Sequence, residues 1–179
     1  MAIGSTMHTF TVQLADVDRG VYEELSLRLA RHPSETAANV LLRVLAYSLE
    51  YEEGIAFSEG IAATDEPAVL VRDATGRLTA WIEVGAPDAA RLHTGSKAAG
   101  RVAVYTHREP NRLAQAWAGK TIHRAADIPL HSFEKDFVED AASALERRNA
   151  VTVSVTERQL YLDVNGRSSS SAIAEQPVG

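Results

Sequence analysis

The first hydrophobic pattern in the chain has a period of two. Residues 8–14 alternate between apolar and polar side chains, and this alternation is typical of a strand with one buried face. Residues 17–31 follow as a predicted helix, because Asp16 can accept hydrogen bonds from the free amides of the first turn. Pro33 would end this helix, since a residue before proline disfavours the helical region.

The next predicted helix, over residues 35–51, is apolar on most of its sides. Ser34 can cap its N-terminus, and Glu35 would lie in the first turn, where a negative charge is favourable. A helix that is hydrophobic nearly all round is usually buried. We therefore expect this helix to be central to the fold.

Three predicted strands follow this helix. The first is a short strand near residues 55–61, and the segments 68–72 and 77–84 form the clearest hairpin of the chain. The connecting residues 73–76 suit a three-residue loop with Gly76 in the left-handed conformation. The hairpin therefore predicts an antiparallel pair with a defined register.

Helices and strands alternate through the second half of the chain. The predicted helices are residues 87–98, 109–118 and 133–148. The predicted strands are residues 101–106, 128–131, 151–155 and 158–164. The serine-rich residues 166–179 are expected to be disordered, which leaves one domain over residues 7–165. The order over residues 34–106 is helix, three strands, helix, strand. This order predicts an α/β sandwich with a mixed central sheet and flanking helices.

Composition narrows the possible functions. The 179 residues include no cysteine, which excludes disulfides and thiolate chemistry. No apolar run approaches the roughly 18–20 residues that span a bilayer, so no membrane partner is expected. The N-terminus lacks a signal-peptide pattern, which with the missing cysteine favours a cytoplasmic location. The net charge of −6 argues against a broad nucleic-acid surface but allows a small local site.

One acid stands inside the apolar second strand of the hairpin. The predicted loop places Pro67 opposite Glu83, with Asp65 diagonally beyond, and a register one residue different places Glu66 opposite Glu83 instead. In either register two carboxylates lie close together, a pair that Mg²⁺ accepts. The free amides of the following helix would face the same corner. The plainer alternative is a solvent-facing Glu83 on the open face of the hairpin.

Other candidate sites are weak. The six histidines show no spacing typical of metal ligands, and no zinc-protease, P-loop or serine-hydrolase motif occurs. We interpret the acidic residues 48–54 as solvated surface, with a contribution to the acidic corner as the lesser alternative. The basic residues within 106–110 make at most a small patch for nucleic acid.

Four segments resemble the YaeQ family of small bacterial proteins in their order and spacing: LARHPSET, TDEP, WIEVGAPD and VAVYTH. The resemblance runs over about residues 8–165. It implies a variant of the PD-(D/E)xK nuclease fold, a restriction-endonuclease-like core of helix, three antiparallel strands, helix and strand. The hydrophobic pattern gives the same order over residues 34–106.

The resemblance also implies a metal site. Asp65 and Glu83 would take the two acidic positions of the nuclease pattern, and Glu35 could be the accessory acid that some of these nucleases carry. These three side chains would hold Mg²⁺.

This chain departs from the nuclease pattern at the lysine. That lysine is expected two residues after Glu83, where the chain has Gly85. Lys97 or Arg91, on the following predicted helix, would then supply positive charge to a phosphate. Arg91 is the better placed, one turn into the helix, but a guanidinium group cannot act as a base.

Two functions are compatible with these residues. The first is a Mg²⁺-dependent, nuclease-like phosphodiesterase acting on nucleic acid, in which the metal polarises a phosphoryl oxygen and activates water. The alternative is a catalytically inactive nuclease-fold protein that binds ligands or influences gene expression. The clustered acids favour the first function, whereas Gly85 and the acidic net charge favour the second. The oligomeric state does not follow from the sequence.

Overall fold

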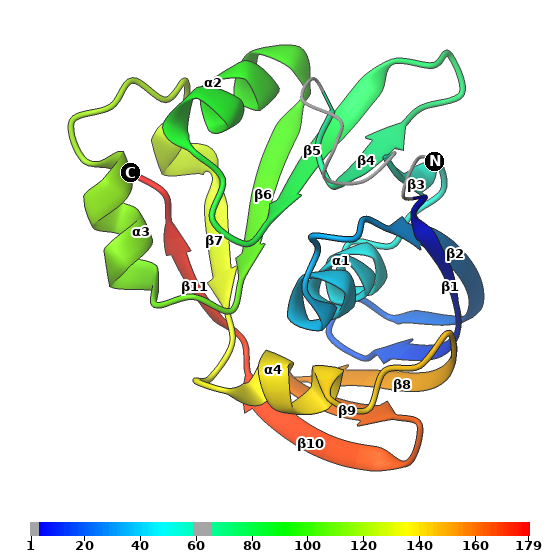
Figure 1. Ribbon diagram of the computed structural model, residues 1–179. Coiled ribbons are helices and arrows are strands. Elements are labelled where there is room, and N and C mark those ends of the chain that lie inside the picture. Colours follow the sequence, from blue (N-terminus) through cyan, green and yellow to red (C-terminus); the bar gives the residue numbers. More distant parts are fainter. Residues whose placement is uncertain (1–3, 59–65) are drawn as a thin grey trace.

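The computed structural model describes residues 4–58 and 66–179. It contains two mixed β-sheets with a helix between them (Figure 1). The strands of the first sheet, in spatial order, are β10 (Arg167–Ala172), β9 (Gln159–Val164), β8 (Arg148–Thr156), β1 (Thr6–Asp16) and β2 (Val21–Arg31). Those of the second sheet are β11 (Ala174–Pro177), β7 (Pro129–Ser132), β6 (Arg101–Thr106), β5 (Leu78–Val84), β4 (Val69–Arg72) and β3 (Ile55–Phe57). The helices are α1 (Ala37–Leu49), α2 (Ala89–Ala98), α3 (Pro110–Trp117) and α4 (Phe137–Ala142), with a 3₁₀ turn at Ala125–Asp127.

Both sheets combine parallel and antiparallel pairs. In the first, β1 and β8 are parallel and the other neighbours antiparallel, while in the second β5, β6 and β7 run parallel. The predicted α/β class with mixed strands is confirmed. The expectation of a single central sheet is wrong, because the predicted strands β1, β8 and β9 form a separate sheet with β2 and β10.

Helix α1 lies between the two sheets (Figure 1). Its side chains pack into one core with residues of β1, β2, β8 and β9 on one side and of β4, β5 and β6 on the other. The prediction of a central, buried helix is therefore confirmed. Its N-terminal cap is Thr36, whose hydroxyl accepts from Asn39 N at 3.1 Å. The predicted cap at Ser34 is wrong, so Glu35 precedes the helix and does not lie in its first turn.

The predicted hairpin is confirmed as β4 and β5, with its loop as expected. Gly76 has a φ of +85°, and Asp73 N donates to Arg77 O at 3.0 Å. Beyond the loop the register shifts between Val71 and Arg72. This irregularity changes every later pairing by one residue, so that the register expected from the loop alone does not extend along β5.

Helices α2 and α3 cover the face of the second sheet that is turned away from α1 (Figure 1). They bury a second core that contains Trp81, Leu92 and Leu113. A Cβ atom at Gly95 would lie 2.6 Å from the Trp81 ring, so that only glycine lets α2 approach this strand so closely. Both faces of β5 are therefore covered. Among the described residues, no helix is both long and apolar enough to cross a membrane.

Residues 21–31 form strand β2, and the predicted helix over 17–31 is wrong. Leu25, Leu27 and Leu29 are buried and alternate with exposed or half-buried residues. This period of two fits a strand, and β2 pairs with β1 along its full length. Asp16 does not cap a helix but accepts hydrogen bonds from the backbone amide and the guanidinium group of Arg19 in the connecting turn.

The C-terminal residues are ordered, contrary to the expectation for residues 166–179. Strand β10 pairs with β9 and β11 pairs with β7, so this segment connects the two sheets. Ile173 and Val178 are buried, and Ser171 Oγ accepts from Glu134 N at 2.8 Å. Backbone pairing and these few buried side chains outweigh the polar composition. The predicted helix over 133–148 is also too long, since α4 ends at Ala142.

Candidate functional site

The parallel strands β5 and β6 end side by side at one edge of their sheet. Val84, the last residue of β5, pairs with Tyr105 near the end of β6. Gly85 then has a φ of +82°, a left-handed conformation that favours glycine, and the chain turns towards α2. Loops that leave the carboxyl ends of parallel strands commonly form ligand sites. A pocket of about 420 Å³ lies at this edge.

The pocket collects side chains from α1, β5, α2 and the loop after β6. Its charged and titratable lining residues are Arg43, Glu66, Glu83, Arg91, His107 and Arg108. Three guanidinium groups thus stand against two carboxylates. The pocket therefore has a slightly positive lining, although the whole chain carries a net charge of −6.

Glu83 is buried, with only 3% of its surface exposed. Arg91 Nε donates to its Oε2, Arg91 Nη2 donates to Oε1 at 3.2 Å, and Ala68 N donates to Oε1 at 3.2 Å. The solvent-facing alternative for Glu83 is therefore wrong, because α2 covers this face of β5. Arg91 Nη2 also donates to Glu66 O at 2.6 Å, so the guanidinium group joins β5 to the segment that precedes β4.

The shifted register decides which residue faces Glu83. Val69 pairs with Ile82, and continuing this pairing by one residue brings Ala68 opposite Glu83. Neither expected partner is therefore directly opposite. Glu66 nevertheless lines the same pocket as Glu83, and its backbone oxygen accepts from Arg91 Nη2. Asp65 lies outside the described residues.

Glu35 belongs to a second buried ion pair below the pocket. Arg43 donates to its carboxylate through Nε at 2.9 Å and Nη2 at 2.7 Å, and Asn39 Nδ2 donates at 2.5 Å. Arg43 Nη2 also donates to Ala30 O at 2.9 Å. Both ion-paired side chains are 1% exposed. This bidentate pair fixes the start of α1 against β2.

The start of α2 differs from the expected anion site. Asp88 is the N-cap, and its carboxylate accepts from Arg91 N at 2.8 Å, so a negative charge already lies there. Arg91 is one turn into the helix and reaches Glu83, as expected. Lys97, the other candidate cation, is exposed in the last turn and does not line the pocket. The structure therefore brings together Glu83 and Arg91 but not Lys97.

The carboxylates expected to hold Mg²⁺ each face an arginine. Glu35 pairs with Arg43 and Glu83 pairs with Arg91. Within the described ranges, no group of three or more histidine, aspartate or glutamate side chains is placed to hold a metal ion. Because a guanidinium group already neutralises each carboxylate, Glu35 and Glu83 fit a shared cation site poorly in this arrangement.

The surroundings of the pocket residues favour a charged Arg91 and a neutral His107. The hydrogen bond that Arg91 donates to Glu83 raises the pKa of Arg91 above its ordinary value, and the nearby carboxylate charges of Glu83 and Asp88 add to this. Burial lowers the pKa of His107, and the positive charge of Arg108 lowers it further. At neutral pH the pocket therefore presents fixed guanidinium charges beside a neutral imidazole ring.

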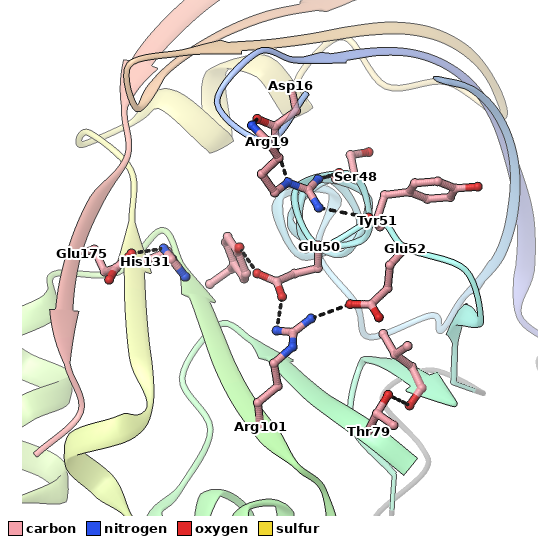
Figure 2. A network of polar contacts seen from close by, with 12 residues as sticks. Asp16, Arg19, Ser48, Glu50, Tyr51, Glu52, Thr79, Arg101, His131 and Glu175 are labelled. Atoms are coloured by element: carbon pink, nitrogen blue, oxygen red, sulfur yellow. Dashed lines mark hydrogen bonds and ion pairs between the residues drawn. The ribbon is translucent and has the colours of Figure 1, made fainter. Parts of the chain in front are cut away.

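A second polar cluster lies at the C-terminal end of α1. Glu50 accepts hydrogen bonds from Arg101 Nη1 and from the Tyr105 hydroxyl (Figure 2). Arg101 Nη2 donates to Glu52 Oε2 at 3.1 Å. The acidic segment 48–54 is therefore not merely solvated surface, because Arg101 on β6 binds two of its glutamates. Neither glutamate lines the pocket beside Glu83.

His131 on β7 extends this cluster towards the C-terminal strands. Its ring stacks on Tyr105 with centroids 4.4 Å apart, and its Nδ1 lies 2.8 Å from Arg158 Nη2. Glu175 Oε1 on β11 lies 3.6 Å from the same nitrogen. Burial lowers the pKa of His131, and the charge of Arg158 lowers it further. The folded protein therefore favours a neutral His131.

The free energy of unfolding is expected to depend on the protonation of His131. As the pH falls below 6.5, the ordinary pKa of histidine, the unfolded chain takes up this proton before the folded protein does. The stabilisation is complete above this pH and is lost as the pH falls through the lower folded pKa. We expect His131→Gln to flatten the dependence of the unfolding free energy on pH, measured by urea unfolding at several pH values. The exposed His123→Gln serves as control, and an unchanged slope in His131→Gln would contradict this assignment.

Sequence reasoning found part of the pocket. It named Glu83 and Arg91 but assigned no role to Arg43 or Asn39. The spacing of four residues from Glu35 to Asn39 and again to Arg43, on an otherwise apolar helix, is a signal for such a cluster. The basic patch within 106–110 was considered only for nucleic acid, and the structure places two of its residues at the pocket.

Comparisons with known proteins agree on one family. A family model described as "YaeQ protein" matches residues 1–173. The chain is 39% identical over 117 residues to "Uncharacterized protein YaeQ" of Escherichia coli (strain K12), which is 65% of this chain and 64% of that protein. The relative of the same name from Salmonella typhi is 37% identical over the same shares. The alignment thus spans less than two thirds of these relatives.

Solved structures resemble the whole fold. The crystal structure of YaeQ protein from Pseudomonas syringae has a TM-score of 0.88 and 30% identity, covering 99% of this chain and 100% of that one. The crystal structure of YaeQ protein from Xanthomonas axonopodis pv. citri has a TM-score of 0.87 and 24% identity, covering 97% and 98%. The second likeness concerns the fold alone.

Proposed function

We propose that this chain, which belongs to the YaeQ family, binds a phosphate group in the pocket beside Glu83 and Arg91 without hydrolysing it. The ligand would be a nucleotide or a short segment of nucleic acid, and the protein would act as a nuclease-fold binding or regulatory protein. One observation carries the proposal: Glu83 and Glu66 O orient the Arg91 guanidinium group at the wall of the pocket.

The chemistry of Arg91 supports a phosphate ligand. Guanidinium groups pair well with phosphate oxygens. Arg91 Nε and Nη2 already donate to Glu83 and to Glu66 O, so Arg91 contributes its positive charge at the pocket wall. The Arg91 side chain is 29% exposed while Glu83 is 4% exposed, so that a ligand meets the cation before the carboxylate. Arg108 lines the same pocket from the loop after β6 and is exposed. Together these two arginines supply one hydrogen-bonded and one exposed positive charge.

Three features support binding without hydrolysis. Gly85 stands where the nuclease pattern has its lysine, and its φ of +82° disfavours any side chain there. Glu35 and Glu83 are neutralised by Arg43 and Arg91. A cation bound between these carboxylates would have to displace an arginine, which would leave a buried charge without its partner.

The second candidate is a Mg²⁺-dependent phosphodiesterase. It is favoured by Glu66 and Glu83 lining one pocket and by Asp65 preceding Glu66 in the chain. The order of α1, the three strands β3 to β5, α2 and β6 also supports the proposed relation to the nuclease core. Hydrolysis would require Glu83 to release Arg91, so this candidate makes a different prediction about metal.

Replacing Arg91 by methionine is expected to weaken phosphate binding about 10- to 100-fold, because it removes a positive charge from the pocket wall and leaves the Glu83 charge there without its partner. Calorimetry with inorganic phosphate, adenosine 5′-monophosphate and a short single-stranded DNA measures this change. Lys97→Met is the matched control, since it removes an exposed cation from the same helix outside the pocket. Equal binding by wild type and Arg91→Met, or no binding by wild type, would refute the phosphate site.

The same titrations repeated with Mg²⁺ separate the two candidates. If the protein binds without hydrolysing, Mg²⁺ gives no cleavage of DNA or RNA and does not tighten binding through Glu83. Cleavage that requires Mg²⁺ and disappears in Glu83→Gln would establish the phosphodiesterase instead. Circular dichroism of each variant shows whether the fold is retained.

A further inference from the structure

Among the described residues, strand β2 is the longest sheet edge without a paired neighbour. It forms one end of its sheet and has 11 residues, whereas the other end strands β10, β3 and β11 have six, three and four. Its pairing with β1 runs through 11 consecutive residues without a bulge. Residues 21–31 contain no proline and no lysine, two residues that commonly block pairing at a sheet edge, and their charges have both signs: Glu23, Glu24, Arg28 and Arg31.

The ladder shows which backbone groups of β2 point away from β1. Thr9 N donates to Arg147 O at 2.8 Å, so Thr9 and the other odd-numbered residues of β1 face β8. The even-numbered residues of β1 therefore face β2, where their partners are odd-numbered, as in the pairing of Phe10 with Leu27. The even-numbered residues of β2 must then direct their N–H and C=O groups to the free edge. Ala30 O agrees, since it accepts from Arg43 Nη2 on the side away from β1.

The same even-numbered residues carry exposed side chains. Tyr22 is 62% exposed, and Glu24, Ser26 and Arg28 are exposed on the outer face of the sheet. Neither Glu24 nor Arg28 forms an ion pair with any residue in the described part of the chain. The edge thus presents free backbone groups beside one acid and one base, two residues either side of Ser26.

We propose that two copies of this chain form a symmetric dimer by antiparallel pairing of their β2 strands about Ser26. Ser26 then lies opposite Ser26 of the second copy, and Glu24 lies opposite Arg28. The two-fold axis repeats this contact, so that the pairing forms two ion pairs. Opposite charges directly across a strand pair are stabilising, and the isologous contact closes the assembly at two subunits. The result is one continuous sheet of ten strands, from the five strands of each copy.

The charges select this register among the alternatives. Pairing centred on Glu24 would place Glu24 opposite its own copy, and pairing centred on Arg28 would do the same for arginine. Like charges directly across a pair are destabilising. Registers between these and the proposed one place Glu24 or Arg28 opposite a neutral residue. Only the pairing about Ser26 places Glu24 opposite Arg28. The pairing about Leu27 would instead place Glu23 opposite Arg31, whose Nε already donates to Glu35 O.

Sedimentation over a series of protein concentrations tests the dimer. Wild type is expected to show a dimer, and Arg28→Glu or Glu24→Arg alone is expected to weaken it about tenfold or more, because each replaces two ion pairs by two repulsive pairs. The double variant Glu24→Arg, Arg28→Glu exchanges the charges and is expected to dimerise again. These exposed positions leave the folded monomer intact, which circular dichroism verifies.

Mixing the two single variants gives a sharper test. Arg28→Glu carries two acids on its edge and Glu24→Arg carries two bases, so a heterodimer is expected from two weakly associating proteins. Ser26→Pro removes an outward N–H group that the strand pairing needs, so it is expected to abolish the dimer. The monomer is expected to fold, since proline is tolerated at an edge position that faces solvent. A wild type that stays monomeric overturns the proposal and leaves the edge to an extended segment of another protein. A dimer that is indifferent to all of these changes also overturns it.

Discussion

Glu35→Gln is expected to lower the free energy of unfolding by about 3–5 kcal/mol, because it leaves the buried Arg43 charge without its partner. Both side chains are 1% exposed, and two hydrogen bonds of 2.9 and 2.7 Å join them. Urea unfolding followed by circular dichroism measures the change. The charge of Arg43 has no other carboxylate partner among the described residues.

A matched control separates burial from charge. Glu52→Gln breaks the contact between Glu52 and Arg101, whose side chains are 51% and 44% exposed respectively. It is expected to lower the free energy of unfolding by less than about 1 kcal/mol. The double variant Glu35→Leu, Arg43→Met removes both charges and is expected to recover much of the loss, since an apolar pair of similar size needs no desolvation of ions. A Glu35→Gln variant as stable as Glu52→Gln would show that the Glu35–Arg43 pair does not hold α1 against β2.

Removing residues 166–179 is expected to destabilise the protein by about 3 kcal/mol or more. Ile173 and Val178 are buried, and burying side chains of this size contributes about 1.5–3 kcal/mol each. The truncation also removes the pairing of β10 with β9 and of β11 with β7. Thermal unfolding and hydrogen exchange of the β7 and β9 amides, compared with the full chain, measure the loss.

Point variants locate the effect within this segment. Ile173→Ser is expected to reproduce a large part of the loss, whereas the exposed Ser170→Ala is expected to change stability by less than about 0.5 kcal/mol. A truncated chain with the melting temperature of the full chain would mean that residues 166–179 behave as the disordered tail that their composition predicts.

Local signals account for the elements that the sequence predicted well. The loop at Gly76 needs a left-handed residue, and the apolar surface of α1 needs burial on every side, whatever lies elsewhere in the chain. Predictions of α2, α3, β6 and β7 also agree with the structure within a few residues. Each of these elements carries its period or its end signal within its own residues.

The errors have equally specific causes. The alternation of Leu25, Leu27 and Leu29 indicated a strand, but the capping potential of Asp16 favoured a helix. In the structure Asp16 binds Arg19 in the turn before β2, and β1 supplies the backbone partners of the strand. The C-terminal strands were missed because serine-rich composition describes side chains, whereas backbone pairing with β9 and β7 orders the segment.

By itself the sequence determined the family, the α/β class, most of the elements and the presence of an acid at the end of the hairpin. The tertiary structure alone decided the partners of that acid. A one-residue register shift changed the pairing along β5, Ala68 N donates to the Glu83 carboxylate, and the packing of α2 buried Glu83 and placed Arg91 on it. Periodicity and turn chemistry act over a few residues, so they can be read along the chain. The partners of a buried charge depend on which distant surfaces exclude water, and that is settled only when the sheets and helices pack together.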